Sequence, residues 1–569
     1  PRAAGAANSN GGCGMTRPRL LIEEWLPAQA LGVECMREQN NPIAKPPHSF
    51  LHAWWARRPL TISRAAVLAS LLPANFDREC FERLLGFYAP SSQIIKMANR
   101  LASKRGDEWI AEGHGKRAFA NSVREDDLSK AHEAMKELWN ETPLVLDPMA
   151  GGGSIPFEAA RLGLDVLANE YNPVACSILE ATTDYPFRFG IMLAEKARKW
   201  GKIWKQRFNE RMETFFAYEG FVPPHNYIFA RTVPCPDTGH STPLVPNWYL
   251  QKPKSGLHIV SEPIVLDQDG GKWTIRVREI GKEAGQLHHP PQPTYGHGKG
   301  LSLFTGTVIP ADYIKAMAQQ GKMGIVLYAI ATKPTRKFEF RPPDPTDLKA
   351  LKAAEKELER LRPQWERDGI IPTEEYPEVS SDERPRRYGM PLWADLFAPR
   401  QLLALGVMVE ELGRLRPEII RAEGQDMGEA VVHLLAFVIN KCTNYNSTLS
   451  VWHPYRSVVA NTFSKHDFSF KATFAEMANC VPDGGLEWAI KNVTKAYEGL
   501  SRLAQASSAN VVTITQGSAT SLLELDDQSV TAVVVDPPYA DNVQYSELAD
   551  FFYVWLKRTQ GHRRPEWFS

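Results

Sequence analysis

The sequence predicts an α/β fold built on a parallel sheet. Two short apolar runs, Leu144–Leu146 and Val166–Ala168, enclose a glycine-rich turn and a helical stretch at Ile155–Leu162. Strand, glycine turn, helix and strand within about 30 residues is the pattern of a βαβ unit, whose two strands are parallel. Strand character returns late in the chain, at Val511–Ile514 and Ala532–Val535. We therefore expect the sheet to draw its strands from two distant parts of the sequence.

Length and composition exclude several classes of protein. The chain has 569 residues, which favours three or four domains, or one domain with large insertions. With 43% hydrophobic and 23% charged residues it is neither collagen-like nor wholly disordered. Apolar stretches such as Val432–Asn440 fall short of the roughly 20 residues of a membrane helix, so no membrane partner is expected. The 66 basic and 66 acidic residues cancel, so a nucleic-acid partner would need a local basic patch.

The seven cysteines argue for a reducing compartment. Their number is odd and their spacing irregular, which is untypical of a disulfide scaffold. No secretory signal peptide is evident, and we expect a cytoplasmic protein.

Composition and pattern divide the chain into seven segments. They are a leader or cloning scar (1–14), an N-terminal segment (15–98), a charged helical insertion (99–141), the first half of the sheet core (142–190), a β-rich insertion (191–345), a helical insertion (346–505) and the second half of the core (506–569). Within the insertions we expect strands at His258–Val265 and Trp273–Ile280, and helices at Leu348–Arg362, ending before Pro363, at Leu402–Leu415 and at Glu429–Ile439.

The first chemical motif is the turn that follows the first strand, Asp147-Pro148-Met149-Ala150-Gly151-Gly152-Gly153. Its glycines let the backbone approach a ligand, and the helix that follows offers free N–H groups to an anion. The spacing is neither GxGxxG nor a phosphate loop. The Asp147 carboxylate suits a ligand with an ammonium group beside a carboxylate, such as S-adenosylmethionine. A tight structural turn is the alternative.

The second candidate is Glu170, which ends the second strand 17 residues after Gly153. An acidic residue about 20 positions after a glycine-rich turn commonly accepts hydrogen bonds from ribose hydroxyls. Asn172-Pro173 then begins the next helix. Taken alone, Glu170 would be a surface acid, but the motif before it favours the ribose role.

The third motif, Asp536-Pro537-Pro538-Tyr539, closes the last apolar run. Proline cannot continue a central strand, so the chain must turn there. A carboxylate and a backbone carbonyl can accept both N–H groups of an exocyclic amine, while a tyrosine ring stacks on the base. The lone pair of the amine is then free to attack a sulfonium methyl group. The alternative is a plain turn after a buried strand.

These motifs, DPMAGGGSIPFEA, NEYNP and DPPYADNVQYSELADFFYVWLKR, resemble those of the amino-methylating DNA methyltransferases. The chain is most similar to adenine-specific DNA methylases with a zinc-ribbon insertion, over nearly its whole length from about Leu20, including PPHSFLHAWWARRPL. The resemblance implies a doubly wound, Rossmann-like methyltransferase sheet, with a large α+β insertion for target recognition between its cofactor and catalytic halves. It also implies a role in bacterial restriction-modification or antiviral defence.

The resemblance implies a role for the matching residues. Asp147, Ala150, Gly151 and Gly153 would line the methionine part of the cofactor, Glu170 would hold its ribose, Ser518 and Ala519 would contact its adenine, and Trp55 and Arg57 would close over its carboxylate. Pro148 and Asn172 would also belong to the cofactor site, and Asp536, Pro537, Pro538 and Tyr539 would hold and activate the target amine. By composition alone, Trp54 and Trp55 are more often core residues, and Arg57-Arg58 could equally meet phosphates.

We therefore expect an S-adenosylmethionine-dependent DNA methyltransferase that acts on N6 of adenine in a base flipped out of double-stranded DNA. Transfer would be direct, with no covalent intermediate and no required metal. N4 of cytosine is the alternative target, because it is also an exocyclic amine. A non-catalytic DNA-binding or sensing subunit that retains the cofactor fold is the second alternative. Other subunits of a defence or modification system remain open as partners.

The first departure from the family concerns the zinc ribbon, which needs two Cys-x-x-Cys-like pairs. The first knuckle, Cys235–His240, keeps one cysteine, and the second, expected after Gly306-Thr307-Val308, has none. His288, His289 and His297 could complete a mixed site. We expect instead a degenerate ribbon that binds no metal and keeps its β-fold by packing.

The second departure is the short segment after the third motif. Only 30 residues follow Tyr539, and Ser546–Arg558 is predicted to form one helix. Three further parallel strands with their crossovers would need roughly 60 residues or more. We therefore expect a truncated chain, or one completed by another polypeptide.

Overall fold

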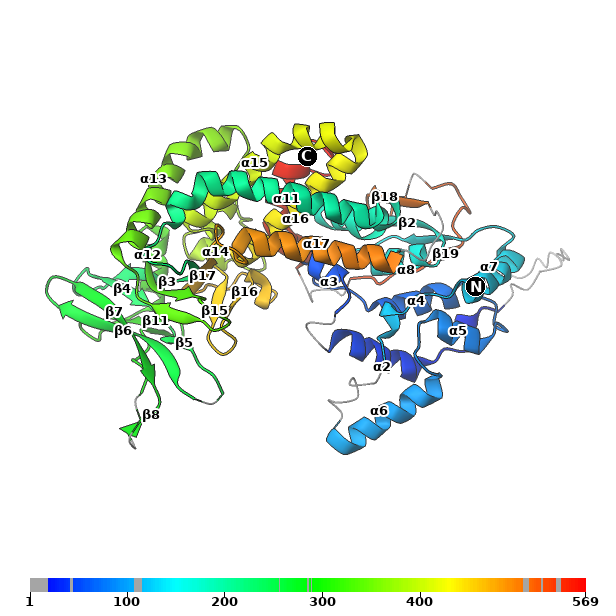
Figure 1. The fold of residues 1–569 in the computed structure, drawn as a ribbon, viewed down its shortest axis with the longest axis horizontal. Coiled ribbons are helices and arrows are strands. Elements are labelled where there is room, and N and C mark those ends of the chain that lie inside the picture. Colours follow the sequence, from blue (N-terminus) through cyan, green and yellow to red (C-terminus); the bar gives the residue numbers. More distant parts are fainter. Residues whose placement is uncertain are drawn as a thin grey trace, which may run out of the picture. The chain divides into compact units, whose positions relative to one another are not determined.

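The protein folds into two units. The computed structural model describes residues 19–40, 45–106, 115–254, 256–283, 286–287, 289–504, 511–522, 525–538 and 544–568 (Figure 1). Unit 1 consists of residues 1–46, 57–170 and 503–537, and unit 2 of residues 47–56, 171–502 and 538–569. The chain therefore passes between the two units several times.

Unit 1 contains the predicted parallel sheet. Its strands are β1 (Leu144–Asp147), β2 (Asp165–Glu170), β18 (Val512–Gln516) and β19 (Ala532–Val533). They lie in the order β18-β2-β1-β19, and every neighbouring pair is parallel. The four strands expected from the apolar runs are thus confirmed, and strands from the two distant parts of the sequence pair directly.

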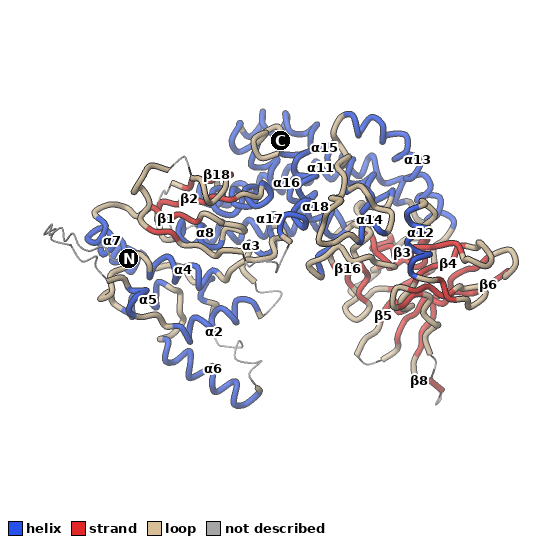
Figure 2. Tube along the Cα trace, turned by 180° about the vertical axis from the view of Figure 1, so that it is seen from behind, coloured by secondary structure: helices blue, strands red, loops and turns tan. Residues whose placement is uncertain are grey.

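Helix α8 (Ser154–Arg161) connects β1 to β2, packs on both, and is packed in turn against α4 (Leu60–Ala69) (Figure 2). The Glu158 carboxylate of α8 is fully buried and pairs with Arg64 and Arg161 at 2.6 Å each. Removing one partner of such a buried pair leaves an uncompensated charge, so these ion pairs fix the helix that follows the glycine turn.

The remaining helices of unit 1 come from the N-terminal third of the chain. They are α1 (Leu21–Glu24), α2 (Ala28–Gln39), α5 (Arg78–Leu84), α6 (Ser91–Arg105), the 3-10 turn η2 (Ala118–Ala120) and α7 (Glu125–Trp139). The boundary expected between residues 98 and 99 falls inside α6, so the charged segment continues a helix of the preceding one.

Unit 2 contains the other helices of the described chain. They are α3 (His48–Leu51), α9 (Pro173–Leu179), the π-helix η3 (Glu180–Asp184), α10 (Tyr185–Arg188), α11 (Gly190–Met212), η4 (Glu213–Phe216), α12 (Ala311–Gln319), α13 (Pro345–Arg367), α14 (Arg384–Arg387), η5 (Trp393–Leu396), α15 (Pro399–Glu423), α16 (Gln425–Tyr445), η6 (Thr462–Ser464), α17 (Gly485–Ala504) and α18 (Tyr545–Gln560). The helices expected within α15, α16 and α18 are confirmed. No helix in the described part of the chain is both long and apolar enough to cross a membrane.

The end expected for α13 is wrong, because the helix continues through Pro363 to Arg367. A proline inside a helix removes one hydrogen bond and costs about 3 kcal/mol. Trp365 in the extra turn is 1% exposed, and its ring lies directly against Gly406 of α15. Burial of this side chain offsets the cost of the proline.

The strands of unit 2 are antiparallel. The main sheet has the order β14 (Glu339–Arg341), β13 (Gly324–Thr332), β3 (Pro224–Pro234) and β17 (Thr473–Met477), with β4 (Ser241–Leu244) also paired to β3. Smaller sheets are formed by β5 (Tyr249–Gln251), β6 (His258–Asp267) and β7 (Lys272–Ile280), by β8 (Lys282–Glu283) and β9 (Gln286–Leu287), by β10 (Tyr295–Gly296), β11 (Lys299–Leu301) and β12 (Val308–Ile309), and by β15 (Val451–His453) and β16 (Val458–Ala460). The expected strands at 258–265 and 273–280 are confirmed as β6 and β7.

Candidate functional site

The carboxyl ends of the parallel strands in unit 1 bring predicted site residues to one edge of the sheet. Asp147 ends β1, Glu170 ends β2, and Asp536 follows β19. The strand order reverses between β1 and β19, since β2 and β18 extend from one side of β1 and β19 lies on the other. In open α/β sheets, ligands bind beyond the carboxyl ends of the strands at such a reversal.

The glycine turn is shaped for close approach of a ligand to the backbone. Gly151 and Gly153 have positive φ of 50° and 81°, a region that side chains with a β-carbon avoid. The Glu170 carboxylate accepts a hydrogen bond from the Gly151 N–H at 2.7 Å. The glycine motif and Glu170, separate in the sequence prediction, therefore form one continuous structure.

The three acidic side chains at the strand ends act on one another electrostatically. Asp147 is 2% exposed, and its carboxylate accepts a hydrogen bond from the Met149 N–H at 3.2 Å. Burial, together with the negative charges of Glu170 and Asp536, raises the pKa of Asp147 to about 7, although the Met149 N–H opposes the shift. A site that holds a carboxylate partly protonated at neutral pH favours a ligand that brings a positive charge.

Two arginines of unit 1 contact these motifs. The Arg57 Nη1 donates to the Gly152 carbonyl at 2.9 Å, and Arg58 forms an ion pair with Asp536. Burial lowers the pKa of Arg57 to about 9, so the side chain stays charged at neutral pH. Sequence reasoning placed Arg57 in the site but did not predict the ion pair of Arg58 with Asp536. No local sequence pattern connects two residues that are so far apart in the chain.

Sequence reasoning also missed Asn169, which fixes the edge of the sheet. Its side chain is fully buried; Nδ2 donates to the carbonyls of Pro148 at 3.1 Å and Gly517 at 3.0 Å, and Oδ1 accepts from Thr515 at 2.9 Å. The sequence did contain a signal for this role, since an amide residue directly follows the apolar run 166–168. A polar side chain that is buried at such a place needs hydrogen-bond partners. Asn169 therefore joins the turns that follow β1 and β18.

The other predicted cofactor residues differ in their surroundings. Ser518 and Ala519 are half-buried in the turn after β18, where the Ser518 Oγ lies 2.8 Å from the Thr520 Oγ1. Asn172, in unit 2, caps α9 by accepting from the N–H of Val174 at 2.9 Å. Asn172 thus has a structural task that requires no ligand.

Trp55 belongs to unit 2, where its ring centroid lies 5.1 Å from that of Phe463 and 6.3 Å from that of Phe552. Trp55 is half-buried, so it packs against aromatic rings without being a fully buried core residue. Of the third motif, Pro537 is an exposed residue of unit 1 and Pro538 an exposed residue of unit 2, and Tyr539 lies outside the described residues.

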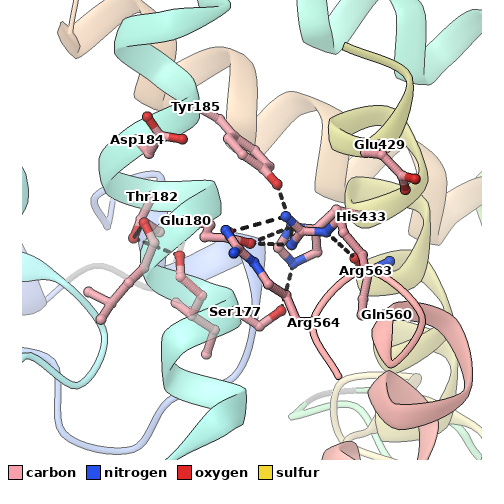
Figure 3. Close-up of polar contacts among 12 residues, drawn as sticks. Ser177, Glu180, Thr182, Asp184, Tyr185, Glu429, His433, Gln560, Arg563 and Arg564 are labelled. Carbon is pink, nitrogen blue, oxygen red and sulfur yellow. Dashed lines mark hydrogen bonds and ion pairs between the residues drawn. The ribbon is translucent and has the colours of Figure 1, made fainter. Parts of the chain in front are cut away.

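Unit 2 holds a buried network around His433 that sequence reasoning did not single out (Figure 3). The His433 Nε2 lies 2.6 Å from the Ser177 Oγ, and its Nδ1 lies 2.9 Å from the Tyr185 hydroxyl and 3.5 Å from the Glu180 carboxylate. The arrangement has the form of a hydrolytic triad. However, Ser177 is 1% exposed and His433 fully buried, and burial lowers the pKa of His433 well below its usual range.

The network is therefore structural. Glu180 also pairs with Arg563 and Arg564, so the segment after α18 is tied to the π-helix. A fully satisfied polar network of this kind specifies a unique packing of the helices that it joins.

The segment expected to be a degenerate zinc ribbon contains two turns of identical backbone pattern. In the first, the Cys235 N–H donates to the His240 carbonyl and the Gly239 N–H to the Cys235 carbonyl, both at 2.8 Å. In the second, the Ser302 N–H donates to the Thr307 carbonyl at 2.8 Å and the Gly306 N–H to the Ser302 carbonyl at 3.0 Å. The second turn therefore covers 302–307 and overlaps Gly306-Thr307-Val308, while the expectation of a second knuckle after those residues stays a prediction.

Hydroxyl groups occupy three of the four positions that cysteines would take in this ribbon. The Cys-x-x-Cys spacing corresponds to Cys235 and Thr238 in the first turn, and to Ser302 and Thr305 in the second. Burial raises the pKa of the Cys235 thiol, but hydrogen bonds from Ser302 and Thr238 outweigh it and lower the pKa. These hydroxyls therefore lie against the Cys235 sulfur.

Two of the histidines considered for a mixed site with Cys235 are His240 and His288. The His240 Nε2 lies 2.8 Å from the Asp269 carbonyl, and His288 lies outside the described residues. Among the residues that the structure describes, no three histidine, cysteine or acidic side chains are grouped closely enough to hold a metal ion.

We predict that the protein purifies without stoichiometric zinc, whereas Thr238→Cys/Ser302→Cys/Thr305→Cys binds one equivalent. Four thiolates satisfy tetrahedral zinc, and hydroxyl groups are poor substitutes for them. Elemental analysis after purification without chelator measures both. One equivalent of zinc in the natural protein, lost on Cys235→Ser, would contradict the prediction.

A second prediction concerns the pH dependence of the sheet edge. Because the pKa of Asp147 is about 7 in the folded protein and about 3.9 when unfolded, the folded state binds more protons between these values. The free energy of unfolding should therefore fall as pH rises from 4 to 7. A ligand carrying an ammonium group binds the ionised carboxylate, so its affinity should rise by up to about tenfold per pH unit below pH 7.

Calorimetry with S-adenosylhomocysteine between pH 6 and pH 8 measures how the affinity depends on pH. In the Asp147→Asn variant the affinity should change little over this range. A natural protein whose affinity does not change over this range would remove Asp147 from the ligand site.

Comparison with known proteins gives one match. A family described as "Protein of unknown function (DUF1156)" matches residues 25–84. This range includes α4, the helix that packs on α8. No curated protein and no solved structure matches the chain.

Proposed function

We propose that this protein is an S-adenosylmethionine-dependent DNA methyltransferase that acts on N6 of adenine. The observation that carries the proposal is the strand order β18-β2-β1-β19, which joins the glycine turn, Glu170 and Asp536 at one edge of a parallel sheet. We take these four strands as part of a doubly wound, Rossmann-like sheet. The reversal of strand order between β1 and β19 is the feature that supports this assignment.

The residues at this edge fit the cofactor. S-adenosylmethionine supplies an activated methyl group on a sulfonium, and also carries an ammonium group and a ribose. The buried Asp147 carboxylate, with Glu170 and Asp536 acting on it, favours such positive charges. The Ser154 Oγ at the start of α8 is 7% exposed and has no hydrogen-bond partner among the described residues, which leaves a polar group for a ligand.

Asp536 is proposed to accept hydrogen bonds from the target amine. Its ion pair with Arg58 orients the carboxylate, and Pro537 restricts the backbone directly after it. An amine held in this way keeps its lone pair directed away from the base plane and toward the methyl donor. The chain's part in the reaction is therefore positioning, which supplies a large share of many enzymatic rate enhancements.

A basic groove in unit 2 supports DNA as the partner. Helices α11, in green, and α17, in orange, run side by side in opposite directions (Figure 1). Between them lies a groove of about 790 Å³ that is lined by six cations and two carboxylates, namely Arg198, Lys202, Lys205, Lys491, Lys495 and Arg502 against Glu487 and Glu498. This local excess of positive charge is what a chain of zero net charge needs for nucleic-acid binding.

The two carboxylates are already neutralised within the groove. Glu487 pairs with Lys491 at 2.8 Å and also with Lys205. Glu498 pairs with Arg502 at 2.5 Å and also with Arg198. Lys202 and Lys495 are exposed and pair with no carboxylate in the described part of the chain, so phosphates can neutralise them.

We predict that Lys202→Gln/Lys495→Gln weakens binding to duplex DNA equally for all sequences. Each lost phosphate contact should reduce the slope of log K against log salt by about 1, so the double variant should lose about 2. Fluorescence anisotropy at several salt concentrations measures the slope. Lys349→Gln/Lys356→Gln, two exposed lysines of α13, is the matched control. Equal slopes for both variants would separate this groove from DNA binding.

The activity itself is tested with radiolabelled S-adenosylmethionine and duplex DNA, followed by nucleoside analysis. N6-methyladenine is the expected product. N4-methylcytosine would indicate the alternative target. DNA binding with no methyl incorporation would favour the non-catalytic subunit.

A further inference from the structure

One buried arginine of unit 2 lacks the counter-charge that the others have. Among the residues that the structure describes, five arginines are buried as whole residues, namely Arg37, Arg64, Arg161, Arg231 and Arg400. Four pair with a carboxylate: Arg37 with Glu34, Arg64 and Arg161 with Glu158, and Arg400 with Glu476. Arg231, on β3, is 6% exposed and pairs with none in the described part of the chain.

The contacts of Arg231 are all with neutral groups. Its Nε donates to the Lys471 carbonyl at 3.1 Å and its Nη2 to the Thr448 Oγ1 at 2.9 Å. The remaining contacts are to the thioethers of Met323 and Met390, at 3.9 and 3.5 Å, and to the face of Phe470, 5.3 Å from the ring centroid. Burial lowers the pKa of Arg231 to about 10, so the guanidinium remains charged at neutral pH.

Burying a charge without an opposite charge costs free energy, so buried charges in proteins are normally paired. The thioether sulfurs are weak acceptors, so the Nη1 group has only a weak partner. The guanidinium therefore has both the charge and the donor capacity to bind an anion.

Arg231 lines a cavity of about 240 Å³ in unit 2. Arg362 of α13 also lines it, and pairs at 2.7 Å with Glu366, which is outside the cavity lining. The one acidic residue of the lining, Asp395, uses its carboxylate to accept from the Leu392 N–H at 2.8 Å at the start of η5. In the described part of the chain, Arg231 is therefore the lining cation that has no carboxylate in an ion pair with it.

We infer that this cavity binds a small oxyanion, either a carboxylate or a phosphoryl group, with Arg231 as its anchor. The planar guanidinium presents parallel N–H donors that match two oxygens of such a group. The volume equals that of several water molecules at about 30 Å³ each, which suits a small anion. The inference rests on unit 2 alone and does not depend on the proposed methyltransferase activity.

The test measures thermal unfolding of the full chain against added inorganic phosphate or acetate, at constant ionic strength with chloride as the reference anion. A saturable rise in Tm is expected with at least one of the two probes. A response to phosphate alone identifies a phosphoryl ligand, and a response to acetate alone identifies a carboxylate. No saturable response to either probe would overturn the inference.

Variants connect the response to the cavity. Arg231→Met, which retains an apolar stem of similar length, should abolish the response. Arg362→Gln should weaken the apparent affinity at least threefold, and Arg360→Gln, an exposed neighbour on the same helix, should leave it unchanged. If Arg231→Met does not fold, the comparison between positions 362 and 360 decides. An unchanged response in Arg231→Met, or equal responses in the two α13 variants, would overturn the inference.

Discussion

Asp536→Ala is expected to lower methyl transfer to DNA by roughly 100-fold or more, while affinity for S-adenosylhomocysteine changes less than about twofold. The carboxylate follows β19, whereas the ribose-binding candidate Glu170 ends β2, so removal of Asp536 spares that contact. Its loss leaves the target amine with one acceptor fewer and its lone pair misdirected. Single-turnover transfer of a radiolabelled methyl group, beside calorimetry, measures the two quantities.

The graded series at this position sharpens the test. Asn retains one carbonyl oxygen as an acceptor, so Asp536→Asn should fall between the natural enzyme and Asp536→Ala. Asp527→Ala removes an exposed carboxylate from the same unit and is the matched control.

A purely structural role makes a different prediction. The ion pair with Arg58 is partly exposed, at 37% and 29%, and such pairs contribute about 0–1 kcal/mol. If Asp536 only holds Arg58, the alanine variant should lose little stability and keep its turnover. A folded variant with near-normal turnover would defeat the catalytic assignment.

Glu170→Ala is expected to weaken binding of S-adenosylhomocysteine by about 10- to 100-fold, because hydrogen bonds to a charged group contribute about 1.5–3 kcal/mol. The loss of affinity should depend on the presence of the ribose hydroxyls in the ligand. The natural protein should discriminate against an analogue that lacks the ribose hydroxyls, and the variant should bind both ligands alike.

The alternative is that Glu170 only holds the glycine turn through the Gly151 N–H. In that case the variant should unfold more easily, while discrimination between the two ligands is retained. Asp165→Asn changes an acid at the other end of β2 and serves as the control. Unchanged affinity in Glu170→Ala would remove Glu170 from the ribose role.

The parts of the fold that could be predicted from sequence are those with local signals. Four apolar runs, three of which end at Asp147, Glu170 and Asp536, located four strands, because a buried parallel strand is a short apolar segment bounded by a turn. The glycine turn followed from residues that tolerate positive φ. Both signals lie within a few residues of the feature that they predict.

The rest depends on contacts between distant segments. The ion pair of Arg58 with Asp536 joins residues 478 positions apart, and the missing counter-charge of Arg231 is visible only once its neighbours are known. The extension of α13 past Pro363 follows from packing of Trp365 on another helix. Likewise, no cysteine marks the turn at 302–307 in the sequence.

The most direct measurement of the central claim is sequencing of DNA from cells that express the full reading frame, with detection of modified bases. The account predicts N6-methyladenine at a defined sequence, and its absence from cells that express Asp536→Ala at an equal level. DNA without modified adenine or cytosine in cells that contain the folded, cofactor-binding protein would contradict it.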